Sequence, residues 1–473
     1  MQAAAEKCRG PGDRRTWLKI GGISLGALAS GGLPSLARLL AAEEAAGGSR
    51  DDFSVILFWA NGGPSHLDLF DLKPQAPAEY RGPFQPTQTN VPGIEINSLL
   101  PRLAKLADKF TIVRSLCHER NEHSGGTHRF LSGYASRAAN LNDGEFPELG
   151  SVVARRLVGR ENDGVPTFVA NTKFYGGGPA YLGPVYAPFM PNPNPLSSTG
   201  ANTYDPIPLY RTDGAQDNFS LTSDGVLTLD RRTGLLRSLD QLPRKLDESD
   251  TLSAVDSFQQ QALAMLVGGK TRQAFDIAHE SDETRTRYGN THWGRSLLTC
   301  RRLIEAGVRF VQCQAEFRLP AGVGRTSTWD DHSVNADIFK AYEVKLPVLD
   351  QSIAALIEDL HERGLDQRVL FLFCGEFGRT PKIQYQDASG RPGRDHWSRA
   401  MSVFLAGGGL RMGQVIGATS AKAEEPVERV MDSNCLLATI YRRFGINPSH
   451  TLPDKLGRPI AILPAGEPIS ELF

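Results

Sequence analysis

The chain has few cysteines, almost no net charge and no long apolar run. Its six cysteines among 473 residues are irregularly spaced and form no Cys-x-x-Cys pair, so a disulfide framework is not indicated. Its formal net charge is -1, without the basic excess that nucleic-acid and polybasic membrane-surface proteins carry. We therefore expect no nucleic-acid partner. Cys313 and Cys374 lie within apolar runs and are expected in the core.

Nucleotide-binding signatures and internal repeats are also missing. The glycine run at 407–409 belongs to neither a Gly-x-Gly-x-x-Gly fingerprint nor a P-loop. A hydrophobic content of 40% and a charged content of 22% are instead ordinary for a soluble globular protein. The length favours one large α/β domain or two domains.

The first 46 residues have the features of a twin-arginine export signal. Arg14 and Arg15 precede a mildly apolar stretch at 20–29 that is rich in glycine and alanine. A membrane anchor is the alternative, but glycines interrupt the stretch and it is shorter than the roughly 20 residues of a span. We predict a signal peptide at 1–46, no stable membrane span after cleavage, and a periplasmic or secreted protein. If the paired arginines were accidental, the protein would be cytoplasmic.

Apolar runs alternate with helical patterns along the remaining chain. Buried strands are predicted where five apolar runs occur, and a long amphipathic helix is predicted at 340–363. The predicted strands are 53–60, 110–115, 308–314, 369–374 and 401–406. This alternation indicates an α/β fold with a mostly parallel sheet and helices on both faces. We predict a single domain at 50–465, with a loop-rich insertion around 172–207 on the substrate side.

Three acidic and histidine-bearing motifs follow apolar runs in the last third of the chain. Residues 329–332 are Trp-Asp-Asp-His, 375–380 are Gly-Glu-Phe-Gly-Arg-Thr, and 393–397 are Gly-Arg-Asp-His-Trp. Open α/β sheets carry their sites at the carboxyl ends of strands. Carboxylates and imidazoles gathered there can bind zinc, calcium, magnesium or manganese. The candidate metal ligands are Asp68, Asp330, Asp331, His332, Glu376, Asp395 and His396.

Each motif also has a purely structural interpretation. Asp330 and Asp331 precede a long helix, where acidic residues interact favourably with the helix dipole. Glu376 is three residues from Arg379, so the two could form a structural ion pair. His396 could be a partly exposed loop residue. These alternatives remain open at the level of sequence.

A histidine-rich segment follows the second predicted strand. His118, His123 and His128 recur every five residues, which does not place all three on one helical face. Within it lie a possible nucleophile, Ser124, a helix start able to bind an anion, and a cation, Arg129. The candidate catalytic residues are therefore His123, Ser124, His128 and Arg129.

Together these motifs resemble the DUF1501 family, exported proteins of the alkaline phosphatase/sulfatase-like superfamily. The resemblance rests on segments 62–74, 288–289, 301–311, 329–332, 375–381 and 393–397 in this order. It implies an alkaline phosphatase-like three-layer sandwich. It also implies that Asp330 or Asp331 binds a metal with His332, and that Glu376 and His396 complete the site. Segment 123–133 resembles the superfamily's nucleophile region.

Two departures from the superfamily affect the expected chemistry. No Cys-x-Pro-x-Arg-like motif is present for the formylglycine of sulfatases, and the first strand ends in Asn61 where an aspartate is usual. Asp68 is a possible substitute one turn later. The resemblance implies a divalent-metal-dependent hydrolase of phosphate or sulfate esters, with His123 or His128 as acid and Arg129 or Arg379 holding the anion. Its substrate would be a small anionic ester or a sulfated or phosphorylated polymer. The alternative is a non-catalytic exported binding or structural module on the same fold.

Overall fold

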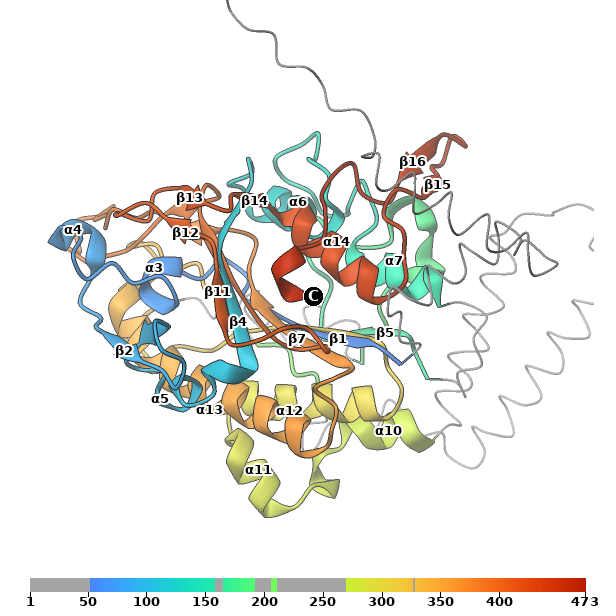
Figure 1. The fold of residues 1–473 in the computed structure, drawn as a ribbon, viewed down its shortest axis with the longest axis horizontal. Helices are drawn as coiled ribbons and strands as arrows, with labels where there is room; N and C mark the ends of the chain where they lie inside the picture. The colour runs from blue at the N-terminus through green and yellow to red at the C-terminus, as the bar shows by residue number, and fades with distance from the viewer. Residues whose placement is uncertain (1–51, 158–164, 192–205, 211–268, 326–327) are drawn as a thin grey trace, which may run out of the picture. The chain divides into compact units, whose positions relative to one another are not determined.

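The computed structural model describes residues 52–157, 165–191, 206–210, 269–325 and 328–473. They all belong to one compact unit (Figure 1). The predicted signal peptide at 1–46 lies outside these ranges, and the predicted insertion at 172–207 is described only in part. No helix in the described ranges is both long and apolar enough to cross a membrane.

An eight-stranded sheet forms the centre of this unit, in the order β11-β4-β10-β7-β1-β6-β5, with β14 also paired to β4. Only β10 runs antiparallel to its neighbours, β4 and β7, and the other pairs are parallel. The mostly parallel sheet is therefore confirmed. The strands are β1 (Ser54–Trp59), β4 (Phe110–Cys117), β5 (Phe168–Ala170), β6 (Phe310–Gln314), β7 (Val369–Cys374), β10 (Met401–Gly407), β11 (Gln414–Ile416) and β14 (Met431–Asp432).

Helices cover both faces of the sheet, which confirms the three-layer α/β architecture (Figure 1). Strand β1 shows why: Ile56 and Phe58 pack into one apolar core, whereas Val55 and Leu57 pack into the other. One layer contains α5 (Pro101–Ala104), α10 (Gly269–Phe275), α11 (Asp282–Tyr288), α12 (His292–Glu305) and α13 (Ile338–Glu362). The opposite layer contains α6 (His123–Ser132), α7 (Leu149–Arg156) and α14 (Ser433–Arg443).

The five predicted strands and the long helix are all present, but three short strands of the sheet, β5, β11 and β14, were not predicted. Each has only two or three residues, too few for a periodic pattern to be visible. Both predicted core cysteines are fully buried. Gly364 follows α13 with φ of 65°, the left-handed conformation in which helices commonly end.

Short elements complete the described chain. The hairpin of β8 and β9 matters for function, since it returns the chain after β7 to the sheet edge and pairs Arg379 with His396. The short elements are α3 (His66–Leu69), α4 (Ala78–Arg81), β2 (Pro86–Gln88), β3 (Glu95–Asn97), η1 (Ala107–Lys109), η2 (Ala180–Leu182), η3 (Pro184–Tyr186), η4 (Ile277–His279), β8 (Gly378–Arg379), β9 (His396–Trp397), β12 (Ala418–Thr419), β13 (Pro426–Glu428), β15 (Thr451–Pro453), β16 (Pro459–Ala461) and η5 (Ser470–Leu472).

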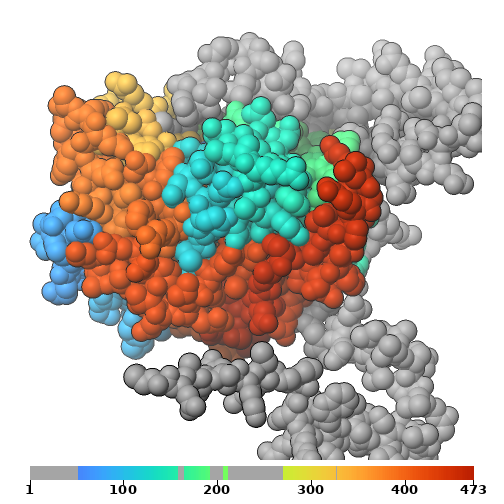
Figure 2. Space-filling model, turned by 90° about the horizontal axis from the view of Figure 1, so that it is seen from above, coloured from blue at the N-terminus to red at the C-terminus, as the bar shows by residue number. Residues whose placement is uncertain are grey.

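Strand direction decides where the functional motifs meet. Strands β1, β6 and β7 are mutually parallel, and β4 shares their direction because β10 runs against both β4 and β7. The carboxyl ends of β1, β4, β6 and β7 therefore lie on one edge of the sheet. In Figure 2 the cyan surface, which includes the residues after β4, borders orange and red surfaces of the C-terminal third.

Candidate metal centre

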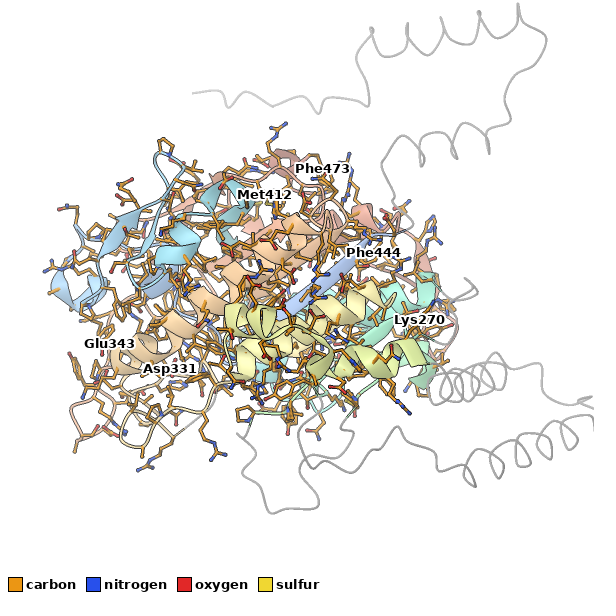
Figure 3. All side chains as sticks on the ribbon, turned by 90° about the horizontal axis from the view of Figure 1, so that it is seen from below. Lys270, Asp331, Glu343, Met412, Phe444 and Phe473 are labelled. Atoms are coloured by element: carbon orange, nitrogen blue, oxygen red, sulfur yellow. The ribbon has the colours of Figure 1, made fainter. Side chains whose placement is uncertain are left out.

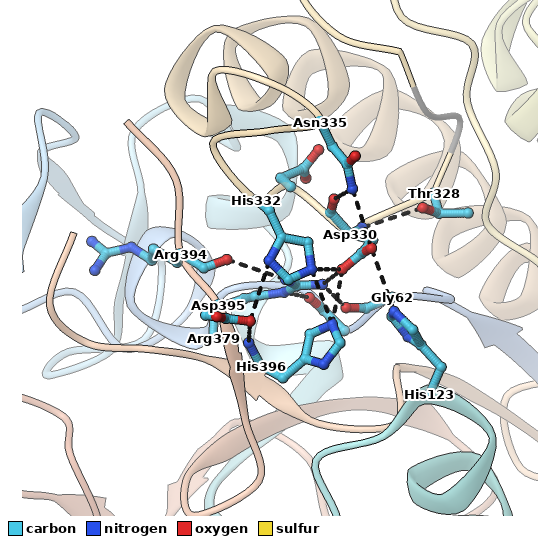
Figure 4. A network of polar contacts seen from close by, with 12 residues as sticks. Gly62, His123, Thr328, Asp330, His332, Asn335, Arg379, Arg394, Asp395 and His396 are labelled. Atoms are coloured by element: carbon cyan, nitrogen blue, oxygen red, sulfur yellow. Dashed lines mark hydrogen bonds and ion pairs between the residues drawn. The ribbon is translucent and has the colours of Figure 1, made fainter. Parts of the chain in front are cut away.

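Four side chains that can bind a metal converge at this edge. His123 is the first residue of α6, Asp330 and His332 lie in the loop between β6 and α13, and His396 lies in β9. One ligand atom from each residue lies within 4.8 Å of the others. Figure 4 shows the three imidazoles arranged around the Asp330 carboxylate. Three of these residues, Asp330, His332 and His396, belong to the predicted strand-end motifs, and the fourth, His123, was predicted as a catalytic residue.

The backbone of the loop around Asp330 repeats every two residues, and this repeat decides which side chains face the cluster. The backbone N–H groups of Asp331 and His332 donate to the carbonyls two residues earlier, at 2.9 and 3.0 Å. Successive bonds of this kind turn alternate side chains to opposite sides. Trp329 and Asp331 are fully buried, whereas Asp330 and His332 face the cluster. Of the two aspartates, the loop therefore turns Asp330 toward the cluster and Asp331 away from it.

All three cluster histidines are held through Nδ1 by an oxygen acceptor. Nδ1 of His123 lies 2.8 Å from Glu376 Oε1, that of His332 lies 3.2 Å from Asp395 Oδ1, and that of His396 lies 2.7 Å from the Asn121 carbonyl. A carbonyl or carboxylate oxygen accepts, so each Nδ1 must donate. Without a metal, each contact between Nε2 and the Asp330 carboxylate needs a proton on Nε2. Once that proton is lost, the Nε2 lone pair faces the cluster, as metal-binding histidines require.

The three Nε2 atoms surround the carboxylate of Asp330. Those of His332 and His396 lie 2.7 and 3.0 Å from Asp330 Oδ1, and that of His123 lies 3.4 Å from Oδ2. The Nε2 atoms of His332 and His396 are 3.1 Å apart. Two nitrogens sharing a tetrahedral zinc at ~2.0–2.1 Å lie roughly 3.3 Å apart. Three imidazoles and one carboxylate at this spacing fit a divalent cation, with zinc matching the nitrogen-rich set best.

The charge balance of the cluster follows from its contacts. Burial raises the pKa of Asp330, but the Arg379 guanidinium and the three histidines outweigh burial and hold it well below its usual value. Burial lowers the pKa of His123, but hydrogen bonds to Asp330 and Glu376 raise it to about 9. In His396, burial prevails and lowers the pKa. A cation that binds here therefore competes with protons on the cluster, above all at His123.

Glu376 lies behind His123 instead of beside the other ligands. Its Oε1 accepts from His123 Nδ1 and from the backbone N–H of Gly62, both at 2.8 Å. Gly62 has φ of 100°, and a Cβ there would meet the backbone N of Asp330 at 2.4 Å. The glycine turn after β1 thus permits the close approach that links three strand ends. Arg379 pairs with Asp330 and not with Glu376, in contrast to the structural alternative considered for this motif.

Asp68 and Asp331, both predicted as ligands, lie outside the cluster. The Asp68 carboxylate is fully buried and pairs with Arg394 at 2.8 Å. Asp331 is fully buried against Lys345, also at 2.8 Å. A carboxylate whose charge is already neutralised by a buried cation gains little from binding a metal ion as well. Asp395 contacts the cluster through His332 Nδ1 and through the backbone N–H of His396, and these hydrogen bonds, that of His332 foremost, lower the pKa of Asp395 to about 2.

The structure brings one of the four predicted catalytic residues, His123, to the cluster. Ser124 Oγ accepts from the Leu141 N–H at 2.8 Å and donates to the Ala139 carbonyl at 3.4 Å. It therefore anchors a neighbouring loop. Along α6 a residue one position later points about 100° away, which removes Ser124 from the His123 side.

His128 and Arg129 also have structural partners. Nδ1 of His128 lies 2.9 Å from the Gly176 carbonyl in the buried layer between α6 and the loop after β5. The Arg129 guanidinium pairs with Glu119 and Asp432. These contacts tie α6 to its surroundings and leave neither side chain directed at the cluster.

Two contributors were not predicted from the sequence. The Asn121 backbone carbonyl holds His396, but a carbonyl has no residue-type signature. Lys345, in the first half of the amphipathic helix α13, is fully buried behind the Asp330 loop. A lysine on the apolar stripe of the predicted helix was the available signal, since lysine is almost never fully buried without a partner.

A family model covers the chain after residue 51. The model of the DUF1501 family, described as a protein of unknown function, matches residues 52–473. Among curated proteins, none matches the chain significantly.

Solved structures similar to this chain include sulfatases and phosphonate monoester hydrolases. The PsFucS1 sulfatase from Pseudoalteromonas sp. is 10% identical, with a TM-score of 0.38, over 88% of this chain and 72% of that one. The phosphonate monoester hydrolase of Agrobacterium radiobacter is 12% identical, with a TM-score of 0.36, over 88% and 78%. That of Silicibacter pomeroyi is 13% identical, with a TM-score of 0.30, over 84% and 73%. At such values the likeness carries no information about activity.

Proposed function

We propose that this protein, which belongs to the DUF1501 family, is an exported divalent-metal-dependent hydrolase of phosphate or sulfate esters. The main support for a metal site is that three histidines share the same orientation. Each donates through Nδ1 to a fixed oxygen, and each presents Nε2 to Asp330. Such prepared tautomers are the usual support for metal-binding imidazoles.

Asp330, His332 and His396 would hold the cation, and His123 would face it from the open side. His123 has the longest contact to Asp330, 3.4 Å, and its side chain is 42% exposed, against 14% for His332 and 20% for His396. A bound cation lowers the pKa of a ligated water and neutralises charge on a transferring group. His123 can serve as fourth ligand or, through Nε2, as the acid that protonates the leaving oxygen.

The ester class rests on the resemblance of the strand-end motifs to the alkaline phosphatase/sulfatase-like superfamily. Anion recognition would fall on the cluster itself, because both arginines predicted to hold the substrate are engaged. Arg379 donates to Asp330 and to the Gly63 carbonyl, and Arg129 pairs with two carboxylates. A divalent cation with His123 beside it supplies the positive charge for a phosphate or sulfate group.

The second candidate is a non-catalytic exported module stabilised by metal. The contacts of Ser124 favour it, since both its hydrogen-bonding directions are used by backbone groups of the 139–141 loop. Binding of a polymer or a partner protein would then replace turnover.

One experiment separates the two candidates. The purified mature protein is assayed for bound metal, then for turnover of model phosphate and sulfate esters with and without chelator. The hydrolase predicts chelator-sensitive turnover that His332→Ala abolishes. If His123→Ala keeps the metal but loses turnover, His123 is the acid, and if it loses the metal, His123 is a ligand. Bound metal without turnover of any ester would leave only the non-catalytic module.

Export is part of the proposal and rests on the twin-arginine pattern at residues 14–15. Replacing both arginines by lysine should retain the protein in the cytoplasm of a host with a functional twin-arginine pathway. An unchanged distribution between periplasm and cytoplasm would contradict export by this route.

A further inference from the structure

The loop that carries Asp330 is fixed from behind by one buried lysine. Lys345 extends from α13, and its Nζ donates to the Thr328 carbonyl at 2.8 Å and to both oxygens of Asp331 at 2.9 and 2.8 Å. Asp331 lies beside the first half of α13, where it pairs with Lys345; Figure 3 labels Asp331 and Glu343, a residue of this part of α13. All three Nζ protons have an acceptor, and these acceptors bracket Asp330 on both sides.

The cost of this arrangement indicates a role beyond stability. Both partners are completely shielded from solvent. Burying a lysine and an aspartate carries a desolvation cost that their attraction often only balances, so such a pair is weak evidence for a stabilising function. Well-attested buried polar pairs instead select one arrangement among several. Here the arrangement selected is which side chains of the loop face the cluster.

A slip of the loop by one residue would exchange its two faces. Asp330 and His332 would turn inward and Asp331 outward, because the loop has a two-residue repeat. Trp329 opposes the slip because its ring stacks on Trp293, with the ring centroids 5.7 Å apart, and because its backbone N–H donates to the Asn61 carbonyl at 2.7 Å. Lys345 opposes it through charge, and its Nζ also lies 5.0 Å from the Trp329 ring centroid.

We propose that Lys345, paired with Asp331, is a positioning residue that sets metal affinity by holding Asp330 and His332 toward the cluster. Lys345 itself touches no ligand atom of the cluster. This inference rests on the proposed function, because it deepens the account of the same metal site.

A merely structural role predicts a different outcome from a positioning role. If the pair only filled the core, removing both charges together would leave metal affinity intact once folding is preserved. If the pair positions the loop, the neutral replacement folds but binds metal more weakly. Supporting residues around metal ligands typically change affinity by ~10–100-fold when removed.

The test compares zinc affinity and melting temperature in three proteins. The double variant Asp331→Asn/Lys345→Met removes both charges at nearly constant volume. The control Asp350→Ala removes another buried carboxylate of the same helix, which accepts from the N–H groups of Arg102 and Leu103 far from the cluster. Competition with a chelator of known affinity gives the dissociation constant for each folded protein.

We expect ~10–100-fold weaker zinc binding in the double variant and an unchanged dissociation constant in Asp350→Ala, even where its melting temperature falls. Wild-type affinity in the folded double variant would overturn the positioning role and leave the metal site intact. Equal losses in both variants would also overturn it, because affinity would then follow stability.

Two further outcomes keep the test decisive. A wild-type protein that binds no zinc would contradict the proposed function itself, and the positioning role with it. Should the double variant not fold, Asp331→Asn alone keeps Lys345 on the Thr328 carbonyl. It should show an intermediate loss of affinity, and wild-type affinity in that folded variant would overturn the positioning role.

Discussion

The loop at 328–332 and the first turns of α6 both carry histidines and polar residues after a strand, yet they supply the cluster differently. The loop has a two-residue repeat and directs Asp330 and His332 to the cluster, with Trp329 and Asp331 in the core. The helix directs only its first residue, His123, to the cluster. Backbone period, more than residue type, decides which side chains reach a strand-end site.

The largest effect is expected from a substitution on the buried side of the loop at 328–332. Trp329→Ala removes a fully buried indole that stacks on Trp293 and donates from Nε1 to the Ala315 carbonyl. Truncating a buried tryptophan costs about 3–5 kcal/mol, so the free energy of unfolding measured in urea should fall by that amount. A loss below about 1 kcal/mol would show that the loop does not depend on this anchor.

The next largest effect is expected from a substitution on the side of the same loop that faces the cluster. His332→Ala removes an imidazole that faces Asp330 at 2.7 Å and is held by Asp395. Removing a ligand should weaken zinc more than removing a supporting residue, so we expect a loss above ~100-fold in affinity. Titration against a competing chelator measures this loss. Affinity within a few-fold of the wild-type value would exclude His332 as a ligand.

A pH experiment sharpens the role of His123, the one residue contributed by the helix. Its pKa is raised from 6.5 to about 9 in the fold, so its protonated form stabilises the metal-free protein. That contribution is fully present below pH 6.5 and is lost as the pH rises through about 9. In chelator, wild-type stability relative to His123→Gln should decline across this window. A pH-independent difference between the two proteins would contradict the Asp330 and Glu376 contacts.

The smallest effect concerns the rest of the helix. Ser124→Ala removes a hydroxyl that accepts from the Leu141 N–H, so stability should fall by about 0.5–1.5 kcal/mol. Zinc affinity and any ester turnover should stay at wild-type values, because Ser124 is not directed at the cluster. A loss of turnover with bound zinc retained would restore Ser124 as a catalytic residue and contradict the comparison.

The sequence predicted the sheet and half of the candidate site for a common reason. Continuous apolar runs such as 369–374 identify buried parallel strands, and polar residues just after them must meet at one edge. This reasoning brought Asp330, His332 and His396 together, whereas Glu376 lies behind His123 and outside the cluster. It assumes only strand direction, which the alternation of strands and helices determines.

Contacts between segments that are far apart in the sequence could not be predicted from local sequence patterns. Asp68 pairs with Arg394, a partner 326 positions away, and Asp331 pairs with Lys345 from a helix whose rotation no local pattern specifies. The choice between Asp330 and Asp331 depends on two backbone hydrogen bonds in an irregular loop. His123 reaches the cluster because it is the first residue of α6. The first residue of a helix is difficult to predict from sequence.

Anomalous diffraction at the zinc edge from a crystal of the mature protein tests the central claim most directly. We predict one peak within ~2.0–2.2 Å of the Nε2 atoms of His332 and His396 and of an Asp330 oxygen. That peak should be absent in His332→Ala crystals grown with the same zinc. A zinc-soaked wild-type crystal with no peak at this cluster would contradict the metal site.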